Sequence, residues 1–216
     1  MSTTRLLAGL LALAIFLPEC AAQDGGPRAE SKAALDAAAE CCALYGEFEY
    51  LRMPLNFPEP FPVGRKGAAY AFPGGKSFFV AFELPRYESS FRIEVTTRIT
   101  GGGYGEAGTS IFCPVALFLN GAYQPIGYRR DLHFTAANPR TRSGNPGLTG
   151  TIVLKESIRT ARYIVFLTDP LALAGRVRFS AGSAKFPGGS SITLVGAFDV
   201  PCGHEGLLEV VIPFAR

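Results

Sequence analysis

The chain has 216 residues and a formal net charge of only +3. Its lysines and arginines form no block and no run of aromatic residues is interleaved with them, so we expect no nucleic-acid partner. It contains 17 Phe, 8 Tyr, 25 Gly and 16 Pro against 2 Met, a composition typical of strands separated by tight turns.

Residues 1–22 have the pattern of a signal peptide. Arg5 precedes an apolar run from Leu6 to Leu17, which is shorter than the roughly 20 residues that span a bilayer. Small residues at Cys20 and Ala22 predict cleavage before Gln23. Lipidation of Cys20 is the alternative, although Glu19 stands where a small residue is expected. A membrane is therefore a partner only if Cys20 is lipidated.

Four cysteines remain in the exported chain, namely Cys41, Cys42, Cys113 and Cys202. An even number in an oxidising compartment predicts two disulfides. Adjacent cysteines rarely pair because the ring is short, so we expect Cys41 and Cys42 each to reach Cys113 or Cys202. Such a bond closes a long loop and is worth about 4 kcal/mol. A zinc site is disfavoured because the adjacent pair has no spacer to direct two thiolates at one metal.

The mature chain is expected to begin with a polar tether. Ser31 is the predicted N-cap of a short helix that continues to about Cys42 and ends before Gly46. Residues 23–46 thus form a tether and helix, and residues 47–216 a single β-sandwich domain.

Period-two alternation marks the clearest strands. Lys76–Leu84 places Phe78, Val80, Phe82 and Leu84 on one face. In Phe91–Ile99 the inward residues are Phe91, Ile93, Val95 and Ile99, and the outward ones Arg92, Glu94, Thr96 and Arg98. The two segments are expected to pair antiparallel around Pro85–Ser90.

Further short strands follow at near-regular spacing, separated by Gly/Pro/Asn clusters. They are Ile111–Leu119, Leu148–Lys155, Arg162–Leu167, Arg176–Ser180, Ser191–Phe198 and Leu207–Ile212. The fold class is therefore mainly β: a β-sandwich of antiparallel strands with a short N-terminal helix after a signal peptide.

The longest irregular segment is expected between Gly121 and Leu148. Long loops on a rigid sandwich often bind ligands. The candidate ligand residues in it are Tyr123, Tyr128, Arg129, Arg130, Asp131 and His133. The tyrosines could stack on sugar rings, but packing over the sandwich edge is the favoured reading.

Motifs for catalysis are missing. The glycine-rich Gly101–Gly105 lacks the Gly-Lys-Ser/Thr of a phosphate loop, and no Gly-x-Ser-x-Gly elbow is present. Cys202-Gly203-His204 is a sequence proximity rather than a catalytic dyad. Nothing ranks the carboxylates that could pair as in glycosidases. They are Glu83, Glu94, Glu106, Asp131 and Asp169. We therefore expect no enzyme activity, cofactor or metal.

Four segments, in their order along the chain, resemble the maltose operon periplasmic protein (MalM) family. They are Gly75-Lys76-Ser77-Phe78-Phe79-Val80-Ala81-Phe82-Glu83-Leu84-Pro85, Ile111–Leu119, Arg162–Thr168 and Glu205–Val211. The resemblance implies a periplasmic protein connected with maltose and maltodextrin uptake, and it supplies no catalytic or ligand residues to transfer. Longer members continue past the β domain with an extension, and we expect the role of that extension to be absent here.

Three functions follow as hypotheses. The first is a non-enzymatic accessory protein that assists carbohydrate uptake by binding a sugar or an envelope transport protein. The second is a structural or scaffolding envelope protein that binds protein or peptidoglycan. The third, and least supported, is an envelope hydrolase using Asp131 or Glu83.

Overall fold

The computed structural model describes residues 27–86, 91–100, 109–130, 135–137, 147–154, 160–179, 183–185, 191–193 and 198–213. The predicted signal peptide, residues 1–22 with Cys20, lies outside these ranges and stays a prediction. Among the described residues no helix is long and apolar enough to cross a membrane.

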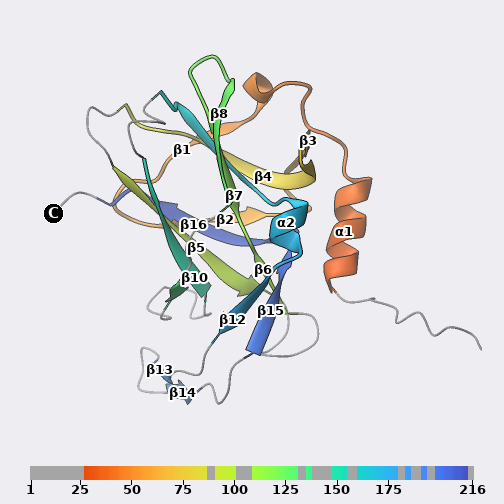
Figure 1. The fold of residues 1–216 in the computed structure, drawn as a ribbon, viewed down its shortest axis with the longest axis vertical. Coiled ribbons are helices and arrows are strands. Elements are labelled where there is room, and N and C mark those ends of the chain that lie inside the picture. The colour runs from red at the N-terminus through yellow and green to blue at the C-terminus, as the bar shows by residue number, and fades with distance from the viewer. Residues whose placement is uncertain are drawn as a thin grey trace, which may run out of the picture.

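The described strands form two packed sheets, which confirms a mainly β sandwich (Figure 1). Sheet I has the order β1-β4-β11-β7-β8, and β3 also pairs with β4. Its strands are β1 (Tyr50–Arg52), β3 (Ala68–Phe72), β4 (Gly75–Glu83), β7 (Val115–Leu119), β8 (Pro125–Arg129) and β11 (Tyr163–Leu167).

Sheet II has the order β12-β15-β6-β5-β10-β9, and β16 pairs with both β2 and β5. Its strands are β2 (Glu59–Val63), β5 (Arg92–Thr100), β6 (Ser110–Phe112), β9 (Thr135–Ala137), β10 (Gly147–Val153), β12 (Arg176–Phe179), β15 (Phe198–Gly203) and β16 (Gly206–Val211). A separate hairpin joins β13 (Ser183–Lys185) and β14 (Ser191–Thr193).

The main core lies between the two sheets, because each strand directs alternate apolar side chains into it. Phe78 and Phe82 of β4 meet Ile93 and Val95 of β5 in one cluster of buried residues. The predicted inward residues are buried, except that Val80 and Phe91 are only partly buried, and Ile99 lies in a separate small cluster.

Sheet I is buried on its outer face as well. β7 is buried at all five positions, and β11 at four of five. Strands covered on both sides have continuous apolar sequences instead of alternation. The second cluster contains Phe48, Phe72, Phe79, Ala81, Leu117, Leu119, Val165 and Leu167. Much of its cover comes from the segment between α1 and β1.

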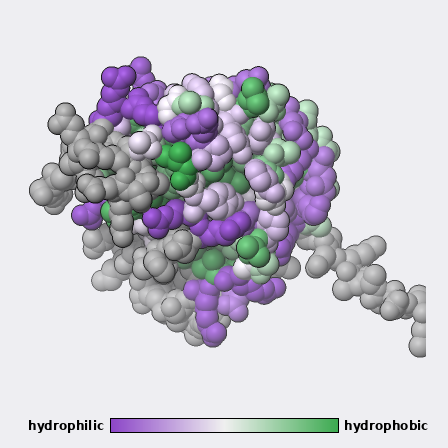
Figure 2. All heavy atoms as spheres, turned by 45° about the horizontal axis from the view of Figure 1, so that its top comes forward, coloured by the Kyte–Doolittle hydropathy of each residue, from purple (hydrophilic) through white to green (hydrophobic). Residues whose placement is uncertain are grey.

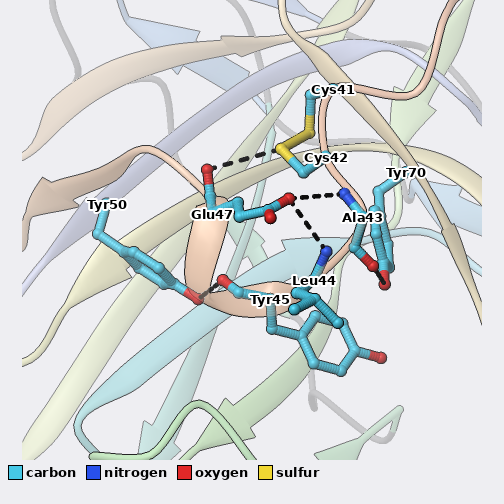
Figure 3. Close-up of a disulfide and its surroundings, with 8 residues drawn as sticks. All are labelled: Cys41, Cys42, Ala43, Leu44, Tyr45, Glu47, Tyr50 and Tyr70. Atoms are coloured by element: carbon cyan, nitrogen blue, oxygen red, sulfur yellow. Dashed lines mark hydrogen bonds between the residues drawn. A yellow bond between two sulfur atoms is a disulfide. The ribbon is translucent and has the colours of Figure 1, made fainter.

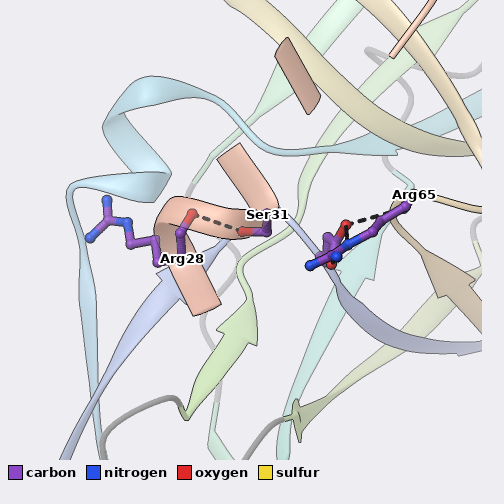
Figure 4. Close-up of polar contacts among 4 residues, drawn as sticks. Arg28, Ser31 and Arg65 are labelled. Atoms are coloured by element: carbon purple, nitrogen blue, oxygen red, sulfur yellow. Dashed lines mark hydrogen bonds and ion pairs between the residues drawn. The ribbon is translucent and has the colours of Figure 1, made fainter. Parts of the chain in front are cut away.

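The N-terminal helix α1 spans Pro27–Ala37 and lies beside the sandwich (Figure 1). Its buried residues are Ser31 and Leu35, one turn apart. Lys76 of β4 donates to the carbonyls of Asp36 and Ala38, which satisfies acceptors left free where the helix ends. The predicted N-cap at Ser31 is wrong, because its hydroxyl donates to the carbonyl of Arg28 within the helix (Figure 4).

Three strand predictions need correction. β4 and β5 do not pair, since β4 lies in sheet I and β5 in sheet II, so the connection crosses between sheets. Ile111–Leu119 is two strands, β6 in sheet II and β7 in sheet I, broken at Cys113-Pro114 because proline offers no N–H to a ladder. Likewise, Ser191–Phe198 contains β14 and only the first residue of β15.

Among the described strands two pairings are parallel, β1 with β4 and β6 with β15, besides a single parallel bridge between Leu55 and Ile212. Both join strands far apart in the chain, whereas adjacent hairpins such as β3–β4 and β7–β8 are antiparallel. Sheet I and sheet II therefore each contain one parallel pairing beside their antiparallel ones.

Candidate functional site

Residues Cys41–Glu47 form an exposed turn between α1 and β1, which we call the knuckle. Its first six residues are Cys41-Cys42-Ala43-Leu44-Tyr45-Gly46 and carry no charge. The last three residues of the knuckle form the 3₁₀ helix η1 (Tyr45–Glu47). Leu44 is 66% exposed, and Tyr45 is half-buried against the cluster on sheet I. Exposing an apolar turn is unfavourable in water, so a knuckle of this composition is a candidate contact surface.

Hydrogen bonds hold the knuckle in one conformation (Figure 3). A carboxylate oxygen of Glu47 accepts from the backbone N–H of Ala43 at 2.7 Å and of Leu44 at 3.3 Å. The hydroxyls of Tyr50 and Tyr70 donate to the carbonyls of Tyr45 and Ala43, at 2.7 Å and 3.3 Å. Contacts ordered before binding lower the entropy that a partner must remove.

The knuckle also carries a disulfide between Cys41 and Cys42, whose Cα atoms are 3.8 Å apart. The other disulfide joins Cys113 and Cys202, with Cα atoms 5.4 Å apart. The expected cross-pairing of the N-terminal cysteines is therefore wrong. Cys202 pairs elsewhere because β15 runs parallel to β6, which places it opposite Ile111 and close to Cys113.

The tip of the β7–β8 hairpin packs against the knuckle. Tyr123 stacks on Tyr163 with ring centroids 4.7 Å apart at 15°, and their hydroxyls are 3.2 Å apart. On Gly46, a Cβ would lie 3.2 Å from the Tyr123 ring, so this glycine permits the close approach. Tyr123 adopts a positive φ of 59°, and the Asn120 side chain accepts from Ala122 and Gln124 to hold the turn.

Tyr163 thus covers one face of the Tyr123 ring, and Gly46 lies close to the same ring. Tyr50 adds a further ring 4.3 Å from Tyr163, and burial raises the pKa of Tyr50 above its usual value. Because sugar stacking needs a free aromatic face, Tyr123 acts here as a packing residue. A ligand-binding role for the tyrosines of this segment stays a prediction.

A second polar cluster gathers at the end of β8. The Asp169 carboxylate accepts from Tyr128 Oη at 3.1 Å and Arg130 Nε at 2.5 Å. It also accepts from the N–H of Ala172 at 2.8 Å, which caps α2 (Pro170–Leu173). Arg130 lies 4.7 Å over the Tyr128 ring.

The charge states of this cluster follow from those bonds. Burial alone would raise the pKa of Asp169, but the donors Ala172, Arg130 and Tyr128 outweigh it and lower that pKa. Burial, together with the neighbouring carboxylate, raises the pKa of Tyr128 to about 12. Asp169 is thus an ionised structural cap rather than a general acid.

The predicted ligand loop is therefore divided. Tyr123 lies at the hairpin tip, and Tyr128 and Arg130 at the opposite end of β8. Arg129 ends β8, half-buried and paired with Ala116. Asp131 and His133 lie outside the described residues. The expectation of one irregular segment from 121 to 148 is wrong because β8, β9 and the start of β10 fall within it.

The remaining candidates for chemistry do not converge where the structure describes them. Glu83 pairs with Arg162 at 3.5 Å, whereas Glu94 lies half-buried on β5. Glu106 and the glycine-rich 101–105 segment are outside the described ranges. In those ranges no group of three or more His, Cys, Asp and Glu side chains is placed to hold a metal.

His204 lies buried in the turn between β15 and β16, 8% exposed. Within the described part of the chain its Nδ1 has no hydrogen-bond partner. Burial, with Arg28 and Lys32 nearby, lowers the pKa of His204, although Asp36 and Glu205 act in the opposite direction. Glu205 also forms an ion pair with Arg65, whose Nε lies 3.0 Å from the Glu205 carboxylate.

We expect acid to destabilise the fold through His204. Because its pKa is lower folded than unfolded, the unfolded chain binds more protons as pH falls below about 6.5. The free energy of unfolding should then decrease with a slope of up to about 1.4 kcal/mol per pH unit. Urea denaturation between pH 7.5 and 5.5 measures this slope. It should vanish in His204→Gln and persist in His133→Gln; an equal slope in all three proteins contradicts the assignment.

The knuckle escaped the sequence analysis because its cysteines were assigned to a helix. The available signal is the apolar run from Cys41 to Tyr45, which follows Glu40 and directly precedes Gly46. No family model, curated protein or solved structure matches the chain. The two disulfides are compatible with an exported protein.

Proposed function

We propose that this protein is an exported, non-enzymatic accessory protein of the bacterial envelope, acting in the periplasm, which assists carbohydrate uptake by binding a transport partner through the knuckle. The observation that carries the proposal is an apolar turn that is both exposed, with Leu44 at 66%, and rigidly held. The resemblance to the MalM family supplies the connection with maltose and maltodextrin uptake. Two disulfides support the oxidising compartment.

A protein partner is favoured over a free sugar at the knuckle. The tyrosines around it stack on one another and on Gly46, so they offer sugar rings little free aromatic face. Apolar side chains such as Leu44 suit the buried centre of a protein interface. The sugar-binding part of the expectation then rests on Tyr128, which is 38% exposed at the other end of β8.

Site-specific crosslinking in cells tests this function. A photoreactive phenylalanine is placed at Leu44, and the control carries it at Leu171, which has almost the same exposure of 68%. We expect position 44 to capture a component of a carbohydrate transport system and position 171 to capture none. Equal capture at both positions, or none at position 44, overturns the proposal.

The identity of the captured partner separates the alternatives. Capture of peptidoglycan or unrelated wall proteins at position 44 supports the scaffolding function. Calorimetric titration with maltose and maltodextrins tests direct sugar binding. Binding heat that is present for the wild-type protein and absent for Tyr128→Ala would support sugar binding as the function. Intact mass of the mature protein checks export, with cleavage before Gln23 as the expected result.

A further inference from the structure

The two disulfides lie in different surroundings. Cys202 is 3% exposed, and Cys113 packs against the small cluster of Ile99, Ile111, Leu148 and Val200. Cys41 is exposed and Cys42 half-buried in the knuckle. Thiol–disulfide exchange requires a thiolate to reach a sulfur atom, so access favours reaction at the knuckle.

We propose that Cys41–Cys42 is a redox-active site, reversibly reduced by the dithiol of a thiol–disulfide oxidoreductase, while Cys113–Cys202 stays oxidised as a structural bond. The exchange goes beyond the proposed function and does not depend on it. In the first step a partner thiolate attacks Sγ of the more exposed Cys41, and the sulfur–sulfur bond breaks with Cys42 leaving as a thiolate that takes a proton. The second partner thiol then attacks the mixed disulfide and releases Cys41 as a thiol.

Two electrons and two protons thus pass from the partner dithiol to Cys41 and Cys42, and the partner leaves as a disulfide. The knuckle provides a hydrogen-bond acceptor for the thiol that reduction produces at Cys42. Sγ of Cys42 lies 3.6 Å from the carbonyl oxygen of Glu47 (Figure 3). A disulfide sulfur carries no hydrogen, whereas the S–H of reduced Cys42 has this acceptor already within reach.

The fold is arranged to survive reduction at this site. Cys41–Cys42 connects neighbours in sequence, so opening it releases no long loop. Other bonds hold the knuckle, including the N–H of Cys41 to the carbonyl of Ala69 at 2.9 Å and the Glu47 carboxylate to two backbone donors. Cys113–Cys202 spans 89 residues and links the end of β6 to β15, so opening it would remove a long-range crosslink from sheet II.

Graded reduction of the oxidised, mature protein tests the assignment. Samples are incubated with dithiothreitol, or with a thioredoxin-type dithiol enzyme, quenched with N-ethylmaleimide and mapped by mass spectrometry. We expect tags on Cys41 and Cys42 at least tenfold faster than on Cys113 and Cys202, with an unchanged far-ultraviolet circular dichroism spectrum. Replacing the reductant with oxidised glutathione, which accepts the two electrons, should restore the disulfide.

The variant Cys41→Ser with Cys42→Ser is the control, because it keeps the structural disulfide. It should lose the fast tagging phase and keep the native spectrum. Simultaneous tagging of all four cysteines, faster tagging of Cys113 and Cys202, or loss of the spectrum during the fast phase each overturns the proposal.

Reduction changes the surface at Cys41 and Cys42 beside Leu44 and is expected to lower crosslinking from position 44 at least threefold, a consequence that rests on the proposed function. If the oxidised protein captures no partner at all, the proposed function fails while the tagging result still decides the redox site. If capture is equal in both redox states, the regulatory consequence is overturned and the exchange site stands.

Discussion

Replacing Glu209 with leucine is expected to lower the free energy of unfolding by about 3 to 5 kcal/mol, because it leaves the Arg98 guanidinium buried without its carboxylate. Arg98 is 1% exposed on β5, and it donates from Nη2 to Glu209 at 2.7 Å and from Nε at 3.3 Å. The pair lies on neighbouring strands, with Leu207 of β16 directly opposite Arg98. Guanidinium chloride denaturation measures the loss.

A double replacement distinguishes the loss of the ion pair from the cost of leaving one charge buried without its partner. Arg98→Met with Glu209→Leu removes both charges, so we expect it to recover most of the stability lost in the single variant. The matched exposed pair is Lys32–Asp36, with side chains 60% and 59% exposed, and Asp36→Asn should leave the denaturation midpoint unchanged. A Glu209→Leu midpoint as close to wild type as that of Asp36→Asn would show that the ion pair does not contribute.

Arg98 also illustrates what the alternating pattern of β5 can predict. Alternation placed Arg98 on the face opposite Ile93 and Val95, and these two are buried in the main core as expected. The same alternation predicts solvent on the other face. The burial of Arg98 depends on Glu209, which is 111 residues away in sequence, and a local pattern contains no such information.

Pairing between strands was the weakest part of the sequence prediction. The sequence pattern predicts β4 and β5 as separate strands, and it predicts that they pair because they are neighbours in the chain. The alternative was visible in composition, since β4 has the nearly continuous apolar sequence of a strand covered on both faces, and β5 alternates. Strands with such different coverage belong more naturally to different sheets.

The candidate site was hidden by local helix propensity. The alanine-rich segment after Ser31 favours helix, but α1 ends at Ala37 because the next residues turn to cover the second cluster. The sequence predicts Tyr123 as a candidate ligand residue and Gly46 only as the end of the helix. Its contact with Tyr123 joins positions from two distant turns, so it arises only in the folded chain.

The Cys113–Cys202 disulfide should dominate stability among the covalent bonds. Replacing both residues with serine is expected to lower the free energy of unfolding by about 4 to 5 kcal/mol in the chain-entropy account, because the bond closes a loop of 89 residues in the unfolded chain. Burial of Cys202 adds to this cost, since its serine hydroxyl would enter an apolar site. Thermal and guanidinium chloride denaturation of the oxidised proteins measure the difference.

The serine pair at Cys41 and Cys42 is the matched control, because it removes the same chemical bond from a loop with a sequence separation of 1. Loop-closure entropy increases with length, so this variant should lose far less stability than the Cys113 and Cys202 variant. Equal losses would contradict both the structural role of Cys113–Cys202 and the independence of the knuckle bond. A large decrease in the free energy of unfolding in the Cys113 and Cys202 variant alone means that this disulfide stabilises sheet II. The Cys41–Cys42 bond can then open and close with little effect on the stability of the fold.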